Sequence, residues 1–297
     1  VLIVGGGIAG VVLANNLQKK NIAKILLVEP KGYLEVPYAQ LRALVEPNTF
    51  SPLIRENYST LLPGITHIQK RATGVKEGTL TLDDGTQESF DFLVIASGSS
   101  FTNWSYLKSE ETDIRKRQEG VEKESSKLEK ANSVLIVGGG SVGVELAGEI
   151  ADKWPDKKIT IVTSSSRVLS GLNEKVSKRA EKLLIKMGVE IVANTRLSED
   201  SKQFWKDANG REFQADIVYP VIGSSVNSKW MEGSPFQLNE QGFVKVGKDL
   251  RVLGSDSIFA IGDINDVPEQ KLGALATNQA KITAKNIERL IKNQDSP

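Results

Sequence analysis

A ten-residue pattern occurs twice in this chain and limits the folds that the chain can adopt. Residues 1–10 read VLIVGGGIAG and residues 134–143 read VLIVGGGSVG. Each copy joins a short apolar run to a glycine-rich turn and then to a helical pattern, which is how a dinucleotide-binding βαβ unit begins. The two copies therefore predict an α/β fold with two Rossmann-like domains and two nucleotide sites.

Both halves of the chain also continue in the same way. The next apolar strand covers residues 24–28 in the first half and 158–162 in the second, and Glu29 and Thr163 follow these strands. Each half then contains a polar hairpin and a return strand, at residues 80–90 and 92–98, and at 204–213 and 217–223. Asp-Gly or Asn-Gly in the hairpins is typical of a tight turn.

The last part of the chain predicts that the first domain is discontinuous. A late strand at residues 257–263 and a closing helix at 273–292 complete that domain in our interpretation. The first domain then covers residues 1–108 and 249–297, and the second domain, residues 109–248, is inserted into it.

Residues 110–131 predict an amphipathic linker helix at the start of the second domain. Ile114, Val121 and Leu128 are spaced by seven and supply its main apolar positions, while most other residues are charged. We interpret the charged side as a solvated face, with a partner-binding helix as the alternative.

Composition argues against several classes of protein. The 38 basic and 37 acidic residues nearly cancel, and no long basic block occurs, so we expect no nucleic-acid partner. No apolar run reaches the roughly 18 to 20 residues that span a bilayer. The first residues predict a strand and turn rather than a secretory leader, and an upstream segment stays open because the chain does not begin with Met.

The rarity of cysteine and histidine limits the chemistry. The chain has no cysteine, which excludes structural disulfides, thiolate metal sites and a redox dithiol. Its one histidine, His67, cannot build a multi-histidine metal site, so we expect no metal and a structural role in the strand 65–68. The absence of cysteine fits a cytoplasmic protein, with peripheral membrane or mitochondrial association left open.

The first glycine motif predicts an FAD site. Gly5, Gly7 and Gly10 serve a tight turn, the close approach of a pyrophosphate, and helix–strand packing, and the helix N-terminus attracts phosphate. Glu29 comes 19 residues after Gly10, where a carboxylate accepts hydrogen bonds from ribose hydroxyls. FAD carries an adenosine with a free 2′-hydroxyl and fits this pattern.

The second glycine motif predicts a nicotinamide dinucleotide site. Its glycines are Gly138, Gly140 and Gly143. Thr163 takes the place of Glu29, and Ser164 and Arg167 follow, so no carboxylate repels a 2′-phosphate. This favours NADPH, with NADH as the alternative. Arg167 is a candidate ligand of the 2′-phosphate, and its alternative is an ordinary surface charge.

Several motifs together carry a family resemblance. GGGIAG, GGGSVGVELAGEI, VIASGS and the late FAIGD occur in this order along the chain. The chain resembles the flavoproteins with two dinucleotide-binding domains, and within them the apoptosis-inducing-factor-like group, which includes a ferroptosis suppressor that reduces quinones. The similarity extends over nearly the whole chain.

The resemblance implies further FAD contacts. Asp263 would bind the ribityl chain or the pyrophosphate, and Gly273 and Ala274 would bring a positive helix end to the flavin ring, which stabilises its anionic reduced form. The other candidates are Lys31, Arg42, Ala96, Ser97 and Gly98. Arg42 has a surface ion pair as its alternative role.

The resemblance also implies residues around the nicotinamide. Glu145, on the first helical turn after the second motif, would lie near the two rings and position them, and its alternative is a helix N-terminal acid that the dipole favours. Ile222 and Gly223 would face the nicotinamide from the return strand.

These expectations combine into an enzyme that passes hydride from NADPH or NADH to FAD and then electrons to a small-molecule acceptor of the quinone type. The alternatives are a flavin-binding redox-signalling protein with slow turnover and a reductase component for a small electron-carrier protein. Relatives usually continue beyond the closing helix with a cap layer, so its apparent absence predicts a more open flavin face. The sequence leaves the oligomeric state open.

Overall fold

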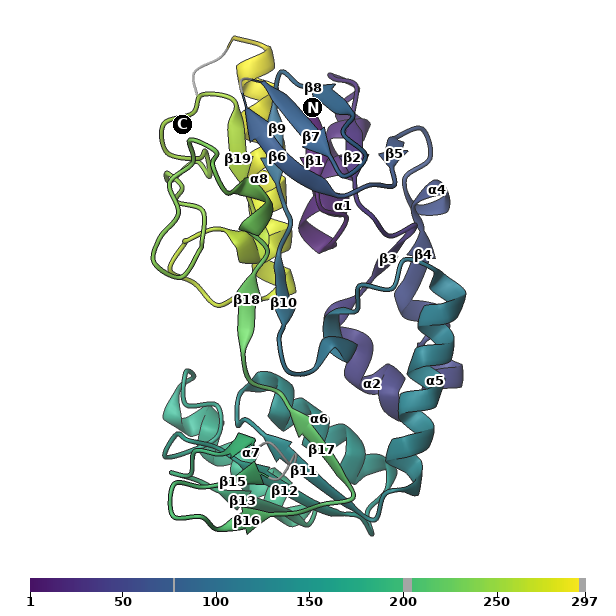
Figure 1. Cartoon of the computed structure of the whole chain (residues 1–297), viewed down its shortest axis with the longest axis vertical. Coiled ribbons are helices and arrows are strands. Elements are labelled where there is room, and N and C mark those ends of the chain that lie inside the picture. The colour runs from purple at the N-terminus through teal and green to yellow at the C-terminus, as the bar shows by residue number, and fades with distance from the viewer. Residues whose placement is uncertain (77, 200–204, 294–297) are drawn as a thin grey trace.

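The computed structural model describes residues 1–76, 78–199 and 205–293, which form two lobes stacked along the long axis of the molecule (Figure 1). The first lobe contains the N-terminus and the last helix, and the second lobe contains the middle of the chain. The predicted α/β fold with two Rossmann-like sheets is confirmed. None of the helices in the described residues is long and apolar enough to cross a membrane.

The first lobe is built on a parallel five-stranded sheet in the order β19-β9-β1-β2-β5. Its strands are β1 (Leu2–Val4), β2 (Leu26–Val28), β5 (Thr66–Ile68), β9 (Leu93–Ile95) and β19 (Ile258–Ala260). Ile3 packs with the helices on one face, while Leu2 and Val4 pack on the other face. This alternation explains why the strand is apolar throughout, since both faces of the sheet are buried.

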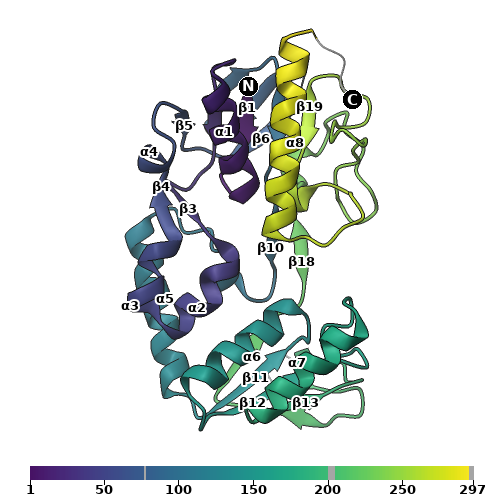
Figure 2. The same cartoon turned by 180° about the vertical axis from the view of Figure 1, so that it is seen from behind.

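Two helices and a small antiparallel sheet cover the faces of the first sheet. Helices α1 (Ile8–Lys20) and α8 (Gly273–Ile291) lie side by side on one face, as Figure 2 shows. Strands β6 (Ala72–Lys76), β7 (Thr79–Leu82) and β8 (Gln87–Ser89) form the hairpin layer on the other face. The late strand and the closing helix therefore belong to the first lobe.

The second lobe repeats this plan on a parallel sheet in the order β13-β12-β11-β17. Its strands are β11 (Ser133–Val137), β12 (Lys158–Val162), β13 (Val189–Val192) and β17 (Ile217–Pro220). Helices α6 (Ser141–Lys153) and α7 (Glu174–Lys186) accompany them. The hairpin layer consists of β14 (Ser198–Glu199), β15 (Trp205–Lys206) and β16 (Glu212–Phe213), and Phe204, where we expected it to begin, lies outside the described residues.

The chain crosses between the lobes on a two-stranded ribbon. Strand β10 (Ser99–Phe101) pairs antiparallel with β18 (Ser224–Val226), and both run from one lobe to the other (Figure 1). After β18, Met231, Val244 and Val252 are buried in the first lobe. The boundary expected at 248/249 does not match this packing, because the chain returns to the first lobe directly after β18. The returning segment has isolated bridges instead of regular strands, so it has no periodic pattern to place it.

A helical layer lies beside the ribbon and joins the lobes (Figure 1). It contains α2 (Gln40–Val45), α3 (Pro47–Phe50) and α5 (Ile114–Lys130). Asp113 caps α5 by accepting hydrogen bonds from the amides of the next turn, and Val121 and Leu128 are fully buried, as the seven-residue spacing predicted.

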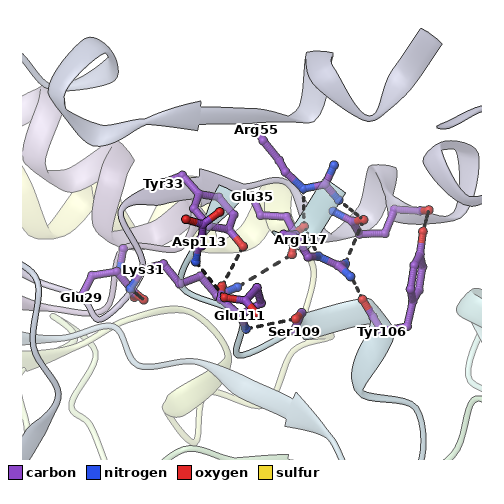
Figure 3. A network of polar contacts seen from close by, with 12 residues as sticks. Glu29, Lys31, Tyr33, Glu35, Arg55, Tyr106, Ser109, Glu111, Asp113 and Arg117 are labelled. Carbon is purple, nitrogen blue, oxygen red and sulfur yellow. Dashed lines mark hydrogen bonds and ion pairs between the residues drawn. The ribbon is translucent and has the colours of Figure 1, made fainter. Parts of the chain in front are cut away.

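A buried ionic network fixes α5 to the first lobe (Figure 3). Glu35, in β3 (Tyr33–Glu35), accepts hydrogen bonds at Oε1 from Arg55 Nε at 2.6 Å and from Arg117 Nε at 2.7 Å. Arg55 begins β4 (Arg55–Asn57), and Arg117 belongs to α5. Both guanidinium groups also donate to Oε1 of Gln40 in α2. One carboxylate thus connects three segments that are far apart in the sequence.

Candidate functional site

The first glycine turn leaves open space beside Gly7. A Cβ on Gly5, whose φ is +109°, would lie 2.3 Å from the carbonyl oxygen of Ala96, and a Cβ on Gly10 would lie 1.9 Å from that of Gly5. The packing of the protein itself therefore requires these two glycines. At Gly7, the N-cap of α1, a Cβ would meet nothing within 4 Å, and no described side chain caps the helix. A phosphate group has room there beside the free amides of the helix N-terminus.

The second turn has the same construction. A Cβ on Gly143 would lie 2.0 Å from the carbonyl oxygen of Gly138, whose φ is +128°. Gly140 is the N-cap of α6, and a Cβ there would again meet nothing within 4 Å. In both turns the third glycine of the motif thus packs against the carbonyl oxygen of the first, and the second leaves open space.

The two turns differ in the side chain that lies against the middle glycine. A Cβ on Gly6 would lie 2.1 Å from the hydroxyl oxygen of Tyr58 and 2.8 Å from Cγ of Glu29, whereas a Cβ on Gly139 would lie 2.8 Å from Cβ of Thr163. Thr163 therefore occupies the position that Glu29 has in the first lobe. The first site presents a carboxylate at this position and the second a hydroxyl.

Backbone amides hold the Glu29 carboxylate at the end of β2. Its Oε2 accepts from the amide of Gly6 at 2.8 Å and its Oε1 from the amide of Lys31 at 3.1 Å. The Lys31 ammonium lies 3.8 Å from Oε2 of Glu35, and burial lowers its pKa despite the nearby Glu35 and Glu29 carboxylates. His67 Nε2 donates a hydrogen bond to the carbonyl oxygen of Glu29 at 2.8 Å, which supports the end of the strand.

Asp263 lies in a polar cluster at the end of β19. Its Oδ2 accepts a hydrogen bond from Ser99 Oγ at 2.7 Å and another from the Lys108 ammonium at 2.8 Å. Burial acts to raise the pKa of this carboxyl, but Lys108, Ser99 and the more distant Lys271 outweigh it, so the pKa lies below its usual value. Asp263 is therefore a carboxylate at neutral pH.

The N-terminus of α8 lies beside the first glycine turn. A Cβ on Gly273 would lie 3.0 Å from a ring carbon of Tyr38 and 3.2 Å from Cδ1 of Ile8 at the start of α1. Ala274 and Tyr38 are exposed here. The turn, Glu29, Asp263 and the α8 terminus all follow the carboxyl ends of neighbouring parallel strands, which is where open α/β sheets bind ligands.

The segment after β9 fixes the ribbon to the first lobe. Ser97 Oγ donates to the carbonyl oxygen of Asn227 at 2.9 Å, and Asn227 Nδ2 donates to that of Ser97 at 2.8 Å. Gly98, with φ of +66°, accepts from the amide of Asn227, and the buried Ala96 packs under Gly5. Ala96 thus supports the first glycine turn, while Ser97 and Gly98 hold the ribbon to the first lobe.

Arg42 forms an ion pair between α2 and α6. Its Nε lies 2.6 Å from Oε2 of Glu149 on α6. An ion pair is the alternative that the sequence leaves open for Arg42, beside a contact with FAD. Glu145 lies one turn before Glu149, and desolvation by the surrounding protein together with the Glu149 carboxylate raises the pKa of Glu145, although part of its side chain is exposed. The Arg42 side chain on α2 thus contacts α6, the helix that begins at the second turn and carries Glu145.

The remaining candidates surround the second turn. Ile222 lies against it, because a Cβ on Gly138 would be 2.9 Å from its Cγ2, and Gly223 accepts at its carbonyl oxygen from the amide of Thr102 at 2.8 Å. Arg167 donates to the carbonyl oxygens of Leu169, Ser170 and Leu172, so it holds the loop after β12, next to the exposed Ser164.

Sequence reasoning missed Lys108, Lys271 and Tyr38. Lys108 ends a 3₁₀ turn, η3 (Ser105–Lys108), that follows the ribbon, and Lys271 donates to the carbonyl oxygen of Asn265 at 2.7 Å. No local motif marks these three residues, because only the return of β19 and α8 to the first lobe brings Asp263 to Lys108 and Gly273 to Tyr38.

Comparisons with known proteins agree with this geometry. The model of the family described as pyridine nucleotide-disulphide oxidoreductase matches residues 1–280. Apoptosis-inducing factor homolog A of Dictyostelium discoideum is 33% identical over 318 residues, which cover 98% of this chain and 76% of that protein. Human ferroptosis suppressor protein 1 is 27% identical over 316 residues, which cover 99% of this chain and 81% of that protein.

A solved structure supports the fold. A NAD-dependent persulfide reductase from A. fulgidus superposes with a TM-score of 0.80 and 23% identity, over 96% of this chain and 58% of that one. The chain thus spans less than two thirds of that structure, and the likeness concerns the fold alone.

Proposed function

The chain belongs to the pyridine nucleotide-disulphide oxidoreductase family, and from this premise we propose that it passes hydride from NADPH to FAD and then electrons to a quinone-type acceptor. Membership makes it an NAD(P)H-dependent flavin oxidoreductase. Because the chain contains no cysteine, it works without the dithiol that the family name implies.

One observation carries the proposal: the two glycine turns share one construction, but Tyr58 and Glu29 lie against the middle glycine of the first turn and Thr163 against that of the second. Both leave space beside a helix N-terminus, at Gly7 and at Gly140. Glu29 in the first lobe suits a ribose with free hydroxyls, while Thr163 in the second tolerates a 2′-phosphate. This difference supports FAD in the first lobe and a nicotinamide dinucleotide in the second.

The residues of the first lobe fit FAD. Gly7 and the α1 amides would hold the pyrophosphate, Glu29 the ribose, and Asp263 a hydroxyl of the ribityl chain. When bound, FAD supplies a ring that accepts hydride and releases electrons one or two at a time. The N-terminus of α8, at Gly273 and Ala274, would place a positive helix end beside the reduced ring.

The residues of the second lobe would orient the hydride donor. Gly140 and the α6 amides suit its pyrophosphate, and Ile222 and Glu145 would flank the nicotinamide. We assign to Glu145 the positioning of the two rings and no proton transfer, since hydride transfer requires alignment above all. Thr163, Ser164 and the Arg167 cation favour NADPH over NADH.

The proposal that the acceptor is a quinone rests on the similarity to known relatives. Ferroptosis suppressor protein 1 belongs to the group that the sequence resembles, and it matches 99% of this chain. A quinone accepts electrons from a flavin by close approach of two rings, without a protein cysteine.

Steady-state turnover of the FAD-loaded protein with NADPH tests the proposal. A water-soluble short-chain quinone, oxygen and a small iron-sulfur carrier protein serve as acceptors in parallel. We expect quinone reduction at more than about one turnover per second, which is ordinary enzyme behaviour. Activity only with the carrier protein, or slower turnover with every acceptor, would contradict the quinone assignment.

A further inference from the structure

Lys108 connects the ribbon between the lobes to the late strand of the first lobe. It ends η3, directly after β10, and its ammonium donates to Asp263 Oδ2 at 2.8 Å although 155 positions separate the two residues. The same ammonium donates to Ser99 Oγ at 2.6 Å, and Ser99 donates to the same carboxylate oxygen. The side chains of Lys108 and Asp263 are 23% and 20% exposed, so solvent screens this pair only in part.

Both hydrogen bonds fall on one oxygen of the carboxylate. In the described part of the chain, Oδ1 of Asp263 receives no hydrogen bond, while Oδ2 receives two. A half-buried carboxylate with one satisfied oxygen has an acceptor left for a ligand hydroxyl. The strong, charge-assisted bond from Lys108 limits the rotation of the carboxyl group, so the free oxygen keeps a fixed place.

We infer that Lys108 is a positioning residue for the cofactor: it holds Asp263 ionised and oriented, with Oδ1 left to accept a hydroxyl group of the FAD polyol chain. This inference rests on the proposed function, because it takes the first lobe as the FAD site. Lys108 acts through Asp263 and does not itself touch the reacting atoms.

The charges around Asp263 determine the expected pH dependence. Lys108 from η3, Ser99 from β10 and Lys271 from the segment before α8 face this carboxyl and oppose the effect of burial on its pKa. Without the Lys108 cation, burial weighs more and the pKa of Asp263 rises. A protonated Asp263 loses its free anionic acceptor, so the affinity for FAD should fall as the pH falls through the raised pKa, by about tenfold per pH unit.

Titration of the apoprotein with FAD between pH 5 and 8, followed by flavin fluorescence, tests the inference. The variants are Lys108→Met, Lys108→Arg and Asp263→Asn, and Lys123→Met on the exposed side of α5 is the matched control. We expect a nearly flat pH profile of the dissociation constant for the wild type, Lys108→Arg and Lys123→Met. Lys108→Met should bind FAD more weakly, and increasingly so toward pH 5, whereas Asp263→Asn should bind weakly at every pH.

Three results would overturn the inference. The first is a Lys108→Met profile equal to that of the wild type. The second is weakening of Lys108→Met by the same factor at every pH without rescue by Lys108→Arg, which indicates loss of structure, and thermal unfolding of the apoprotein would then show the same loss. The third is a wild-type protein that binds no FAD, which removes the proposed function together with the inference.

Discussion

Gly7 and Gly10 lie three residues apart in the same turn, but they serve different partners. The backbone of Gly5 fills the space beside Gly10, whereas nothing fills the space beside Gly7. Glycine at position 10 is therefore required for the packing of the apoprotein. Glycine at position 7 is required only when a ligand binds, so substitutions at the two positions distinguish folding from binding.

We therefore expect opposite results from two alanine substitutions. Gly10→Ala forces a methyl group against the carbonyl oxygen of Gly5 and should lower the free energy of unfolding by about 1–3 kcal/mol or more. Gly7→Ala, at φ −72°, should change that free energy by less than about 1 kcal/mol and weaken FAD binding at least about tenfold. Chemical denaturation of the apoprotein and FAD titration measure the two effects. Equal stability of the two variants would contradict this account of the turn.

Thr163 should determine the choice of nicotinamide. The first lobe already accommodates a glutamate against the middle glycine, so Thr163→Glu should fit sterically against Gly139. The new carboxylate would repel a 2′-phosphate and accept ribose hydroxyls, which should lower kcat/KM for NADPH about tenfold or more relative to NADH. Kinetics with both donors measures this ratio, and Thr163→Ser is the matched control. An unchanged ratio in Thr163→Glu would show that the phosphate binds elsewhere.

At the scale of elements, the buried Glu35 network joins β3, β4 and α5. Two guanidinium groups, on Arg55 and Arg117, depend on the one Glu35 carboxylate. The pattern of the linker helix was predictable from Val121 and Leu128, but the network was not. Arg117 lies four positions before Val121 on the buried face of the helix, which is the one local signal of its burial. Its partner Glu35 is 82 positions away, and no sequence periodicity connects them.

Glu35→Gln should destabilise the protein strongly. The substitution keeps the shape of the side chain but leaves the Arg55 and Arg117 charges buried without a carboxylate, which should lower the free energy of unfolding by about 3 kcal/mol. Asp84→Asn removes one partner of the exposed Lys70–Asp84 pair and should change stability little. Denaturant unfolding of both variants makes the comparison. A loss in Glu35→Gln no greater than that in Asp84→Asn would contradict the role of the network.

The contact between α2 and α6 allows a test of Arg42. Its ion pair with Glu149 joins α2 to α6, and we expect this structural role rather than contact with FAD. Arg42→Met and Glu149→Gln should therefore leave the dissociation constant for FAD unchanged within about twofold, and their effects on stability should not add in the double variant. A much weaker FAD affinity in Arg42→Met alone would instead favour direct contact with FAD.

At the scale of the whole molecule, the repeat predicted most of the architecture. Two glycine turns, two parallel sheets and the return of β19 and α8 to the first lobe all follow from local patterns. The place where the chain re-enters the first lobe did not follow, because Met231 lies in a short 3₁₀ turn and Val244 forms only isolated bridges, so neither belongs to a strand with a periodic pattern. The contacts of Lys108 and Asn227, which support the site, were likewise unpredictable. These contacts form only when the ribbon is folded against the first lobe.

Anaerobic rapid mixing of the FAD-loaded protein with NADPH or NADH, followed by the flavin absorbance band, tests the central claim most directly. The account predicts rapid and complete bleaching of the flavin with NADPH and slower bleaching with NADH, because the second lobe would align the donor with the flavin of the first. Bound flavin that neither donor bleaches would contradict the claim that the two glycine turns serve one hydride transfer.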